Sequence, residues 1–402
     1  MRAYVPLMLM SLGLPACGGG GGVAGPSGRS VDASRLFDQS MLHDVRLELE
    51  ARDWETLRAN FESNAYYRAR ITIDGQNPGI DVGIRSRGKG TRNSRKPGLR
   101  VDFNRYTAQG TFGGYNSLVL ENMYGDSSFL HERLAFSVFR AVGLPAPQDA
   151  YARVSVNGQY WGVYGLVESV DRHLLQARLG ENDGTLFEFK IEYLYDLSYR
   201  GPNASAYVPF PFEPENATTA DASALIDFTR TISQAADDQF VEQVSAFVDP
   251  QQVLRYYAVE VVVAEADGLT GVGGVNNFFL YQFRGQRRFA FIPWDRDFAF
   301  ARPDHAVYFG LERNQLIRRL LQDAALRAFY EGELRRIVHD HVSTLMPRLE
   351  QAYEQIRQSV LEDPNKRALT ADPNGEFERA VEDVRVVIQE RESSVLAQLG
   401  TE

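Results

Sequence analysis

The chain has 402 residues, 44% of them hydrophobic, so it is long enough to bury a substantial core as one large domain or as two lobes. Its formal net charge of −10 argues against nucleic acid as a partner, because a protein that binds a polyanion must neutralise many phosphates with Lys and Arg. The single cysteine, Cys17, excludes an intramolecular disulfide, so the stability of the fold must come from packing.

The N-terminus has the pattern of a secretion signal. One cation, Arg2, precedes a short apolar stretch that ends in LPAC (residues 14–17), and this stretch is too short to anchor the mature protein across a bilayer. LPAC resembles a bacterial lipobox, with an unusual proline before the small residue. We therefore expect residues 1–17 to be a signal peptide with a lipobox, Cys17 to carry a lipid anchor, and residues 18–35 to be a glycine-rich flexible tether.

A lipid anchor on Cys17 would attach the protein to a membrane outside the cytoplasm. Gly18, rather than an aspartate, follows the cysteine. By resemblance to sorting signals, this favours the outer membrane or the cell surface over retention in the inner membrane. The alternative is an ordinary signal peptide that is cleaved nearby.

Residues 44–115 alternate apolar and polar positions between turn signals, which predicts a strand-rich N-terminal part. Between two predicted strands, 79–84 and 99–103, residues 85–100 contain many cations and glycines but no acid. Glycines let backbone N–H groups approach an anion, and Arg and Lys add charge-assisted donors. A hairpin loop over a phosphate is one interpretation, and a solvated basic loop is the other.

Residues 128–142 have helical spacing, and Asn157-Gly158 predicts the turn of a β-hairpin whose second strand runs into Glu168. Glu168 lies at the start of a predicted helix. It either favours the dipole of that helix or orients a cation of the basic segment, Lys96 or Arg100, towards a phosphate.

The second half of the chain is predicted to be mostly helical. Residues 199–219 contain several prolines and asparagines and are interpreted as a loop or an insertion near the active cleft. Residues 225–248 are predicted to be a helix, and Asp249-Pro250 predicts the start of the next helix, which carries 253–264. Residues 314–399 are mostly helical as well. We therefore expect an α+β fold with a strand-rich N-terminal part and a helical C-terminal part.

Polar residues with oxygen ligands follow in order at the edges of apolar elements. They are Asp267 after the apolar run 256–264, Asn276 and Asn277 before the aromatic strand 278–281, and Asp295 and Asp297 after the apolar run 291–294. A strand places residues i and i+2 on one face, so we expect the last two carboxylates to lie together. Adjacent anions repel each other unless a cation lies between them, and an oxygen-only ligand set suits hard cations such as Mg²⁺. The alternatives are that Asp297 caps a turn and that the asparagines form a turn before the strand.

Several blocks together resemble the CotH family, the spore-coat-protein-H type of atypical protein kinase. The resemblance runs from about Asp44 to Leu399. The matching blocks are GIRSRG (83–88) with KPGLR (96–100), NSLVL (116–120), DSSFL (126–130), VGLPAP (142–147), VNGQYWGVY (156–164) with Glu168, Asp267, Asn277 and PWDRD (293–297). The order and spacing of these blocks are specific, although no single block is decisive.

The resemblance implies a diverged, two-lobed kinase-like fold. Residues 36–310 would be its core, with the N-lobe reaching to about residue 170, and residues 311–402 would be the C-terminal helical part of the same domain. Members of the family are similar to protein kinases that use ATP with Mg²⁺ or Mn²⁺ and phosphorylate Ser or Thr of secreted proteins. The implied partner is therefore a secreted or surface protein, or the chain itself.

The resemblance also implies roles for single residues. Asp295 corresponds to the metal-binding aspartate and Asn277 to the second metal ligand, with Asp297 beside them. Asp267 resembles the catalytic-loop aspartate that accepts the hydroxyl proton. Lys96 is the candidate for the nucleotide-phosphate lysine with Glu168 as the acid that holds it, and Arg87 or Arg100 could share that contact. The sequence departs from the family pattern at Lys89-Gly90-Thr91, after Gly88, and at Pro97, after Lys96.

Two other functions use the same residues. In a metal-dependent glycosyltransferase, Asp295 and Asp297 would grip a nucleotide diphosphate, but the sequence has no early run of strand–helix units of the kind such folds need. In a non-catalytic surface protein, the fold would be retained for binding or adhesion. Scarcity of ATP outside the cytoplasm favours this second alternative, and the presence of Asp267, Asn277 and Asp295 argues against it.

Overall fold

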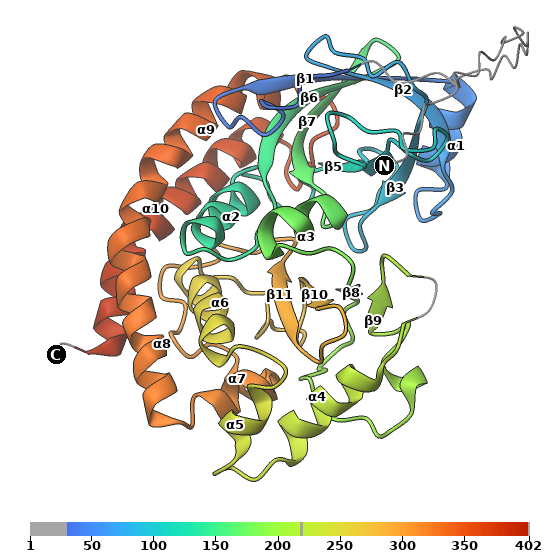
Figure 1. Cartoon of the computed structure of the whole chain (residues 1–402). Helices are drawn as coiled ribbons and strands as arrows, with labels where there is room; N and C mark the ends of the chain where they lie inside the picture. The colour runs from blue at the N-terminus through green and yellow to red at the C-terminus, as the bar shows by residue number, and fades with distance from the viewer. Residues whose placement is uncertain (1–29, 218–219, 401–402) are drawn as a thin grey trace, which may run out of the picture.

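The computed structural model describes residues 30–217 and 220–400, which form a strand-rich N-terminal part and a largely helical C-terminal part (Figure 1). The prediction of an α+β fold with this division is confirmed. The predicted signal peptide, Cys17 and most of the predicted tether lie outside the described residues. None of the helices in the described ranges is both long and apolar enough to cross a membrane.

The N-terminal part is a closed barrel in the order β1-β2-β3-β4-β5-β7-β6. Its strands are β1 (Leu42–Leu49), β2 (Tyr67–Ile73), β3 (Val82–Arg87), β4 (Gly98–Asp102), β5 (Ser117–Glu121), β6 (Asp149–Val156) and β7 (Gln159–Glu168), with α1 (Ala51–Ala59) between β1 and β2. Parallel pairing of β1 with β6 closes the barrel. Alternate residues of β1, such as Val45 and Leu47, are fully buried in the barrel interior, as the alternating pattern predicts.

Two hairpins of the barrel follow from local turn chemistry. Asn157 and Gly158 both have a positive φ, 49° and 79°, and join β6 to β7 in the tight turn that this dipeptide favours. The hairpin of β3 and β4 pairs Arg87 with Gly98 and leaves the basic residues 88–97 as its loop. In Figure 1, β3 points from the barrel towards β8. The loop of this hairpin therefore extends over the second sheet.

The second sheet has the order β11-β10-β8-β9, and its neighbouring strands are all antiparallel within the described residues. Its strands are β8 (Thr185–Phe189), β9 (Phe212–Pro214), β10 (Phe278–Gln282) and β11 (Phe289–Pro293). The segment interpreted as a loop or an insertion is not irregular throughout, because its described part, residues 199–217, contains the short helix η1 (Ala204–Ala206) and strand β9. Strand β9 is at the edge of the sheet, where prolines are tolerated because one side of the strand needs no ladder hydrogen bonds.

Helices surround this sheet and flank the barrel. They are α2 (His131–Ala141), α3 (Arg172–Leu179), α4 (Ser223–Gln234), α5 (Phe240–Val244), α6 (Pro250–Val262), η2 (Leu311–Arg313), α7 (Gln315–Leu320), α8 (Ala324–Ile337), the π-helical turn η3 (Val338–Val342), α9 (Ser343–Leu361) and α10 (Pro373–Leu399). The helix predicted over 225–248 is split, because Ala235 is extended and ends α4. Asp249 caps α6, as predicted, by accepting hydrogen bonds from Gln251 N and Gln252 N. Helices α9 and α10 run along one side of the molecule, past the barrel and the second sheet (Figure 1).

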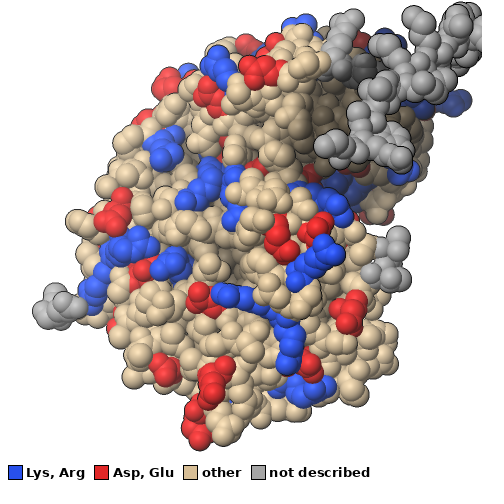
Figure 2. All heavy atoms as spheres, in the orientation of Figure 1, with Lys and Arg blue, Asp and Glu red and all other residues tan. Residues whose placement is uncertain are grey.

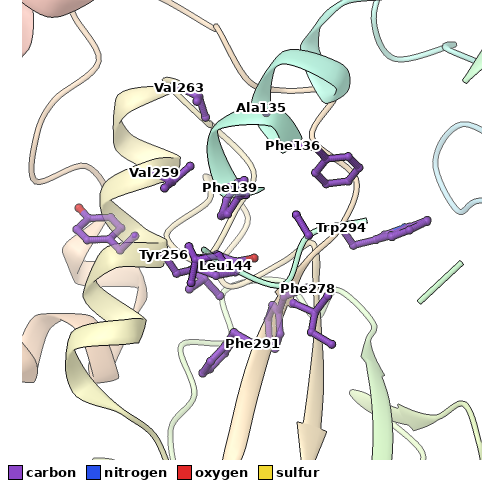
Figure 3. Close-up of a cluster of buried hydrophobic side chains, with 14 of the residues drawn as sticks. Ala135, Phe136, Phe139, Leu144, Tyr256, Val259, Val263, Phe278, Phe291 and Trp294 are labelled. Carbon is purple, nitrogen blue, oxygen red and sulfur yellow. The ribbon is translucent and has the colours of Figure 1, made fainter. Parts of the chain in front are cut away.

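An aromatic cluster packs α2 and α6 against the second sheet (Figure 3). The rings of Phe139 on α2 and Tyr256 on α6 meet edge to face, with centroids 5.0 Å apart. Phe291 of β11 lies 6.2 Å from Tyr256 and 5.2 Å from Phe278 of β10. Because these side chains are buried together, the ends of α6, β10 and β11 are held in a fixed arrangement. The candidate site is built on these ends.

Candidate active site

A cleft of about 600 Å³ separates the β3–β4 loop from the second sheet. One side is basic and comes from Arg85, Arg87, Lys89 and Arg92. The opposite side contains Asp267, Asn277, Asp295 and Asp297, the residues that the sequence singles out. Three separate segments of the chain therefore bring their oxygen-bearing side chains to one cleft.

Local backbone geometry places these groups. Helix α6 ends at Val262, and Ala264 turns the chain with a φ of 53° into the loop that carries Asp267. Asn277 immediately precedes β10 and has a φ of 59°, and Asp295 follows β11 with a φ of 52°. Left-handed backbone at residues other than glycine is strained and concentrates at functional sites.

Asp267 is held by two asparagines. Its Oδ2 accepts hydrogen bonds from Asn276 Nδ2 at 2.8 Å and from Asn277 Nδ2 at 3.1 Å. Burial raises the pKa of Asp267, and the bond from Asn276 opposes this shift. Because the amide nitrogen of Asn277 faces Asp267, its Oδ1 is the atom that can bind a metal. Asn277, for which a turn before the strand was the alternative interpretation, thus lies in the cleft.

The carboxyl groups of Asp295 and Asp297 are close neighbours, and both line the cleft. Burial and then the neighbouring Asp295 raise the pKa of Asp297 well above its usual range. The expectation that strand alternation brings them together is wrong, because β11 ends at Pro293. The left-handed turn at Asp295 brings them together instead. A divalent cation fits this pair, since it would place two positive charges beside two neighbouring carboxyl groups.

Glu132, in the first turn of α2, is a site residue that the sequence did not single out. It is 8% exposed, and its Oε2 accepts a 3.4 Å hydrogen bond from Arg296 N. Burial and the nearby Asp295 raise its pKa to about 8. Asp126 orders the start of α2 by accepting a hydrogen bond from His131 N at 2.8 Å. Acids are common in the first turn of any helix, so no pattern in the sequence distinguishes Glu132 from them.

Arg87 is the predicted phosphate contact that lies in the cleft. Its guanidinium pairs with Glu121 and lies over the Trp294 ring, 4.9 Å from the centroid. Arg92 orders the loop by donating to the Gly88 carbonyl at 2.7 Å, and Lys89 Nζ donates across the cleft to the Ile191 carbonyl at 3.3 Å. The basic segment is therefore a defined loop over the cleft.

The predicted pairing of Lys96 with Glu168 is wrong, and neither residue lines the cleft. Lys96 is fully buried, and its Nζ donates to Asp363 Oδ2 and to the Val163 carbonyl, both at 2.7 Å. Gly162 makes room for this carboxylate, because a Cβ there would lie 2.3 Å from Asp363 Oδ2. Asp363, which lies between α9 and α10, thus holds Lys96 outside the lining of the cleft.

Glu168 and Arg100 also have partners outside the cleft. Glu168 accepts hydrogen bonds from Gln148 N at 3.0 Å and from Arg178 at 3.4 Å, and it contacts His173 at 3.3 Å. Arg100 donates to Asp102 at 2.9 Å. Arg87 is therefore the cleft residue among the cations proposed from the sequence, and Lys89 and Arg92 join it.

A group of acids on β8, on β9 and directly after β9 also lines the cleft. Glu188, Glu213 and Glu215 have carboxylate oxygens within 4.8 Å of one another. Lys190 Nζ lies 2.6 Å from Glu188 and 3.0 Å from Glu213. Because an ammonium group already neutralises part of this cluster, Asp295 and Asp297 are better suited than these acids to hold a divalent cation. On the face drawn in Figure 2, acidic and basic side chains are interspersed.

Comparisons with known proteins identify the family of the chain. Inner spore coat protein H of Bacillus subtilis (strain 168) is 28% identical over 301 residues, which cover 72% of this chain and 80% of that protein. A solved structure titled as the Golgi casein kinase aligns over 91% of this chain and 77% of its own, with 9% identity and a TM-score of 0.32, which is too low to support an argument about fold. Residues 84–395, well over half of the chain, match the family described as CotH kinase protein. The chain therefore belongs to the CotH kinase family.

Proposed function

We propose that this protein is a metal-dependent kinase that transfers the γ-phosphate of ATP to Ser or Thr of secreted or surface proteins, itself included. Membership of the CotH kinase family supports kinase chemistry in general. The observation that carries the proposal is the convergence of Asp267, Asn277, Asp295 and Asp297 on one side of a cleft whose other side is basic. A triphosphate with its cation matches this division of charge.

Asp295, Asp297 and Asn277 Oδ1 are the groups that would hold Mg²⁺ or Mn²⁺, with Glu132 close by. When bound, the metal would neutralise charge on the phosphates during transfer. Arg87, with the cations of the 88–92 loop, would bind phosphate oxygens from the other side. The cleft is thus supplied with positive charge from one side by side chains and from the other by the metal.

Asp267 would act on the acceptor hydroxyl. In the transfer, the bond from the γ-phosphorus to the bridging oxygen breaks, a bond to the Ser or Thr oxygen forms, ADP leaves, and the hydroxyl proton passes to Asp267. The hydrogen bonds from Asn276 and Asn277 fix the direction of the Asp267 carboxylate. Such positioning contributes most of the catalysis in phosphoryl transfer, because the protein takes little covalent part in it.

We further propose that the protein is a lipoprotein of the outer membrane or cell surface, anchored through Cys17. The order of cation, apolar stretch, LPAC and glycine run supports this. ATP would then have to be supplied outside the cytoplasm.

The test is incubation with γ-labelled ATP and each divalent cation in turn, with transfer to the protein itself or to a co-secreted protein as the readout. Asp267→Ala and Asp295→Ala should both stop transfer. Asp237→Ala is the control, because its side chain is 85% exposed and pairs with Arg319 far from the cleft. Full activity in both cleft variants would contradict the assignment of the site, and no transfer by the wild type with any cation would favour the non-catalytic alternative.

A further inference from the structure

Arg296 stands between the two metal-binding aspartates in the sequence, and its side chain is fully buried. Its Nη1 donates to Glu260 Oε1 at 2.7 Å. Its Nη2 donates to the Tyr256 hydroxyl and to the main-chain carbonyl of Asn277, both at 2.6 Å. One guanidinium group therefore joins α6, the residue before β10 and the segment after β11.

Glu260 extends this contact to the loop of the catalytic aspartate. Both of its carboxylate oxygens accept a hydrogen bond from Leu269 N at 3.0 Å. Gly268, which precedes Leu269, packs so closely against Glu260 that a Cβ at this position would lie 2.1 Å from Glu260 Oε1. The backbone on the C-terminal side of Asp267 is therefore fixed by a carboxylate that Arg296 holds.

Glu265 fixes the other side of the same loop. Its Oε1 accepts a hydrogen bond from Asp267 N at 2.8 Å. Its Oε2 is buried, has no hydrogen-bond partner among the described residues, and lies 3.8 Å from Arg296 Nη1. The carboxylates of Glu260 and Glu265, which both bind the Asp267 loop, thus lie close to the guanidinium group of Arg296.

We propose that Arg296 and Glu260 are a positioning pair, which sets Asp267 and Asn277 relative to the metal-binding Asp295. The inference rests on the proposed function. The contacts reach the reacting groups by two routes: from Arg296 through the Asn277 carbonyl, and from Arg296 through Glu260 to Leu269 N. An arginine is needed because its planar fork satisfies three acceptors at once, which an ammonium group on a flexible chain does not do in the same geometry.

The experiment compares Glu260→Gln with Glu333→Gln. Glu333 of α8 is a matched control, because it is 8% exposed, accepts a hydrogen bond at 2.9 Å from Arg255 of α6, and does not line the cleft. For each variant we would measure thermal unfolding, Mn²⁺ binding by electron paramagnetic resonance, and kcat and KM for ADP production from Mg·ATP. Both variants should lose stability, since each removes a charge from an ion pair.

Glu260→Gln should lower kcat by roughly 10–100-fold with little change in KM, whereas Glu333→Gln should retain the wild-type kcat. Arg296→Lys, which frees the Asn277 carbonyl, should also weaken Mn²⁺ binding by about 10–100-fold. If Glu260→Gln does not fold, Tyr256→Phe removes one contact of Arg296 and should give a smaller loss of kcat in a folded protein.

The two possible failures are distinguishable. In the first, the wild type binds Mn²⁺ and ATP, but Glu260→Gln (or Tyr256→Phe, if Glu260→Gln does not fold) keeps the kcat of the wild type. This result would overturn the positioning role and leave the proposed function intact. A wild-type protein that binds neither Mn²⁺ nor ATP would overturn both.

Discussion

Asp363→Asn tests whether Lys96 stabilises the fold rather than binding phosphate. In the wild type, the Asp363 carboxylate accepts hydrogen bonds from Lys96 Nζ at 2.7 Å and from Val163 N at 3.0 Å, with both charged side chains fully buried. In the variant, the ammonium group retains the Val163 carbonyl but loses its counter-charge. Removal of one partner from a buried ion pair costs about 3–5 kcal/mol. This is a large part of a typical free energy of unfolding of about 5–15 kcal/mol.

The loss should depend on pH in a defined direction. Burial lowers the pKa of Lys96 below the ordinary 10.5, and Asp363 opposes this shift, so loss of the aspartate lowers the pKa further. Between the folded and the unfolded pKa, the unfolded chain binds more protons than the folded protein. The stability of the variant should therefore recover as the pH rises towards 10.5, where the lysine of the unfolded chain also becomes neutral.

The assay is urea unfolding at neutral and at alkaline pH, combined with calorimetric titration of Mg·ATP. The double variant Lys96→Met, Asp363→Asn should be more stable than Asp363→Asn, because it leaves no buried charge unpaired. Lys96→Met should bind Mg·ATP with the affinity of the wild type. If Lys96→Met unfolds like the wild type but no longer binds the nucleotide, the structural role is refuted and Lys96 returns as a phosphate contact.

Three further predictions each concern a single residue. Gly125→Ala would place a Cβ 1.7 Å from Asp297 Oδ2 and should weaken Mn²⁺ binding measured by electron paramagnetic resonance. The control is Gly332→Ala, on an exposed part of α8 where a Cβ would meet nothing within 4 Å, and it should leave Mn²⁺ binding unchanged. Equal Mn²⁺ affinities of the two variants would contradict the role of Asp297 as a metal ligand. Because the pKa of Glu132 is raised from 4.5 to about 8, the folded protein holds a proton that the unfolded chain has released. The free energy of unfolding of the metal-free wild type should therefore fall between about pH 4.5 and 8, and Glu132 should contribute up to about 1.4 kcal/mol per pH unit. In unfolding measurements, Glu132→Gln should flatten this pH dependence. An unchanged slope would show that Glu132 is not the group that titrates. Mass spectrometry of the mature protein should find a lipid on an N-terminal Cys17, and an unmodified terminus beyond that residue would end the lipoprotein proposal.

Features set by neighbouring residues could be predicted from the sequence. The Asn157-Gly158 turn, the cap of α6 at Asp249 and the alternation of β1 all depend on residues close in the chain, and the structure contains each of them. The cleft residues Asp267 and Asn277 were found for a related reason, because polar groups at the ends of buried elements stand out from their apolar surroundings.

Features set by distant partners could not be predicted in this way. Lys96 lies next to a glycine-rich basic loop, but its partner, Asp363, is 267 positions away. Glu132 resembles any acid in a first helical turn until α2 brings it beside Asp295. The two aspartates after β11 were placed together for the wrong reason, since a left-handed turn and not strand alternation joins them.

Calorimetric titration of ATP, with and without Mg²⁺, tests most directly whether the converging oxygens hold a cation that binds the triphosphate. The wild type should bind ATP with Mg²⁺ and bind it far more weakly in the presence of a chelator. Asp295→Ala should abolish the metal-dependent binding, whereas Asp267→Ala should retain it. Equal binding of Mg·ATP by the wild type and Asp295→Ala would contradict the account of this cleft.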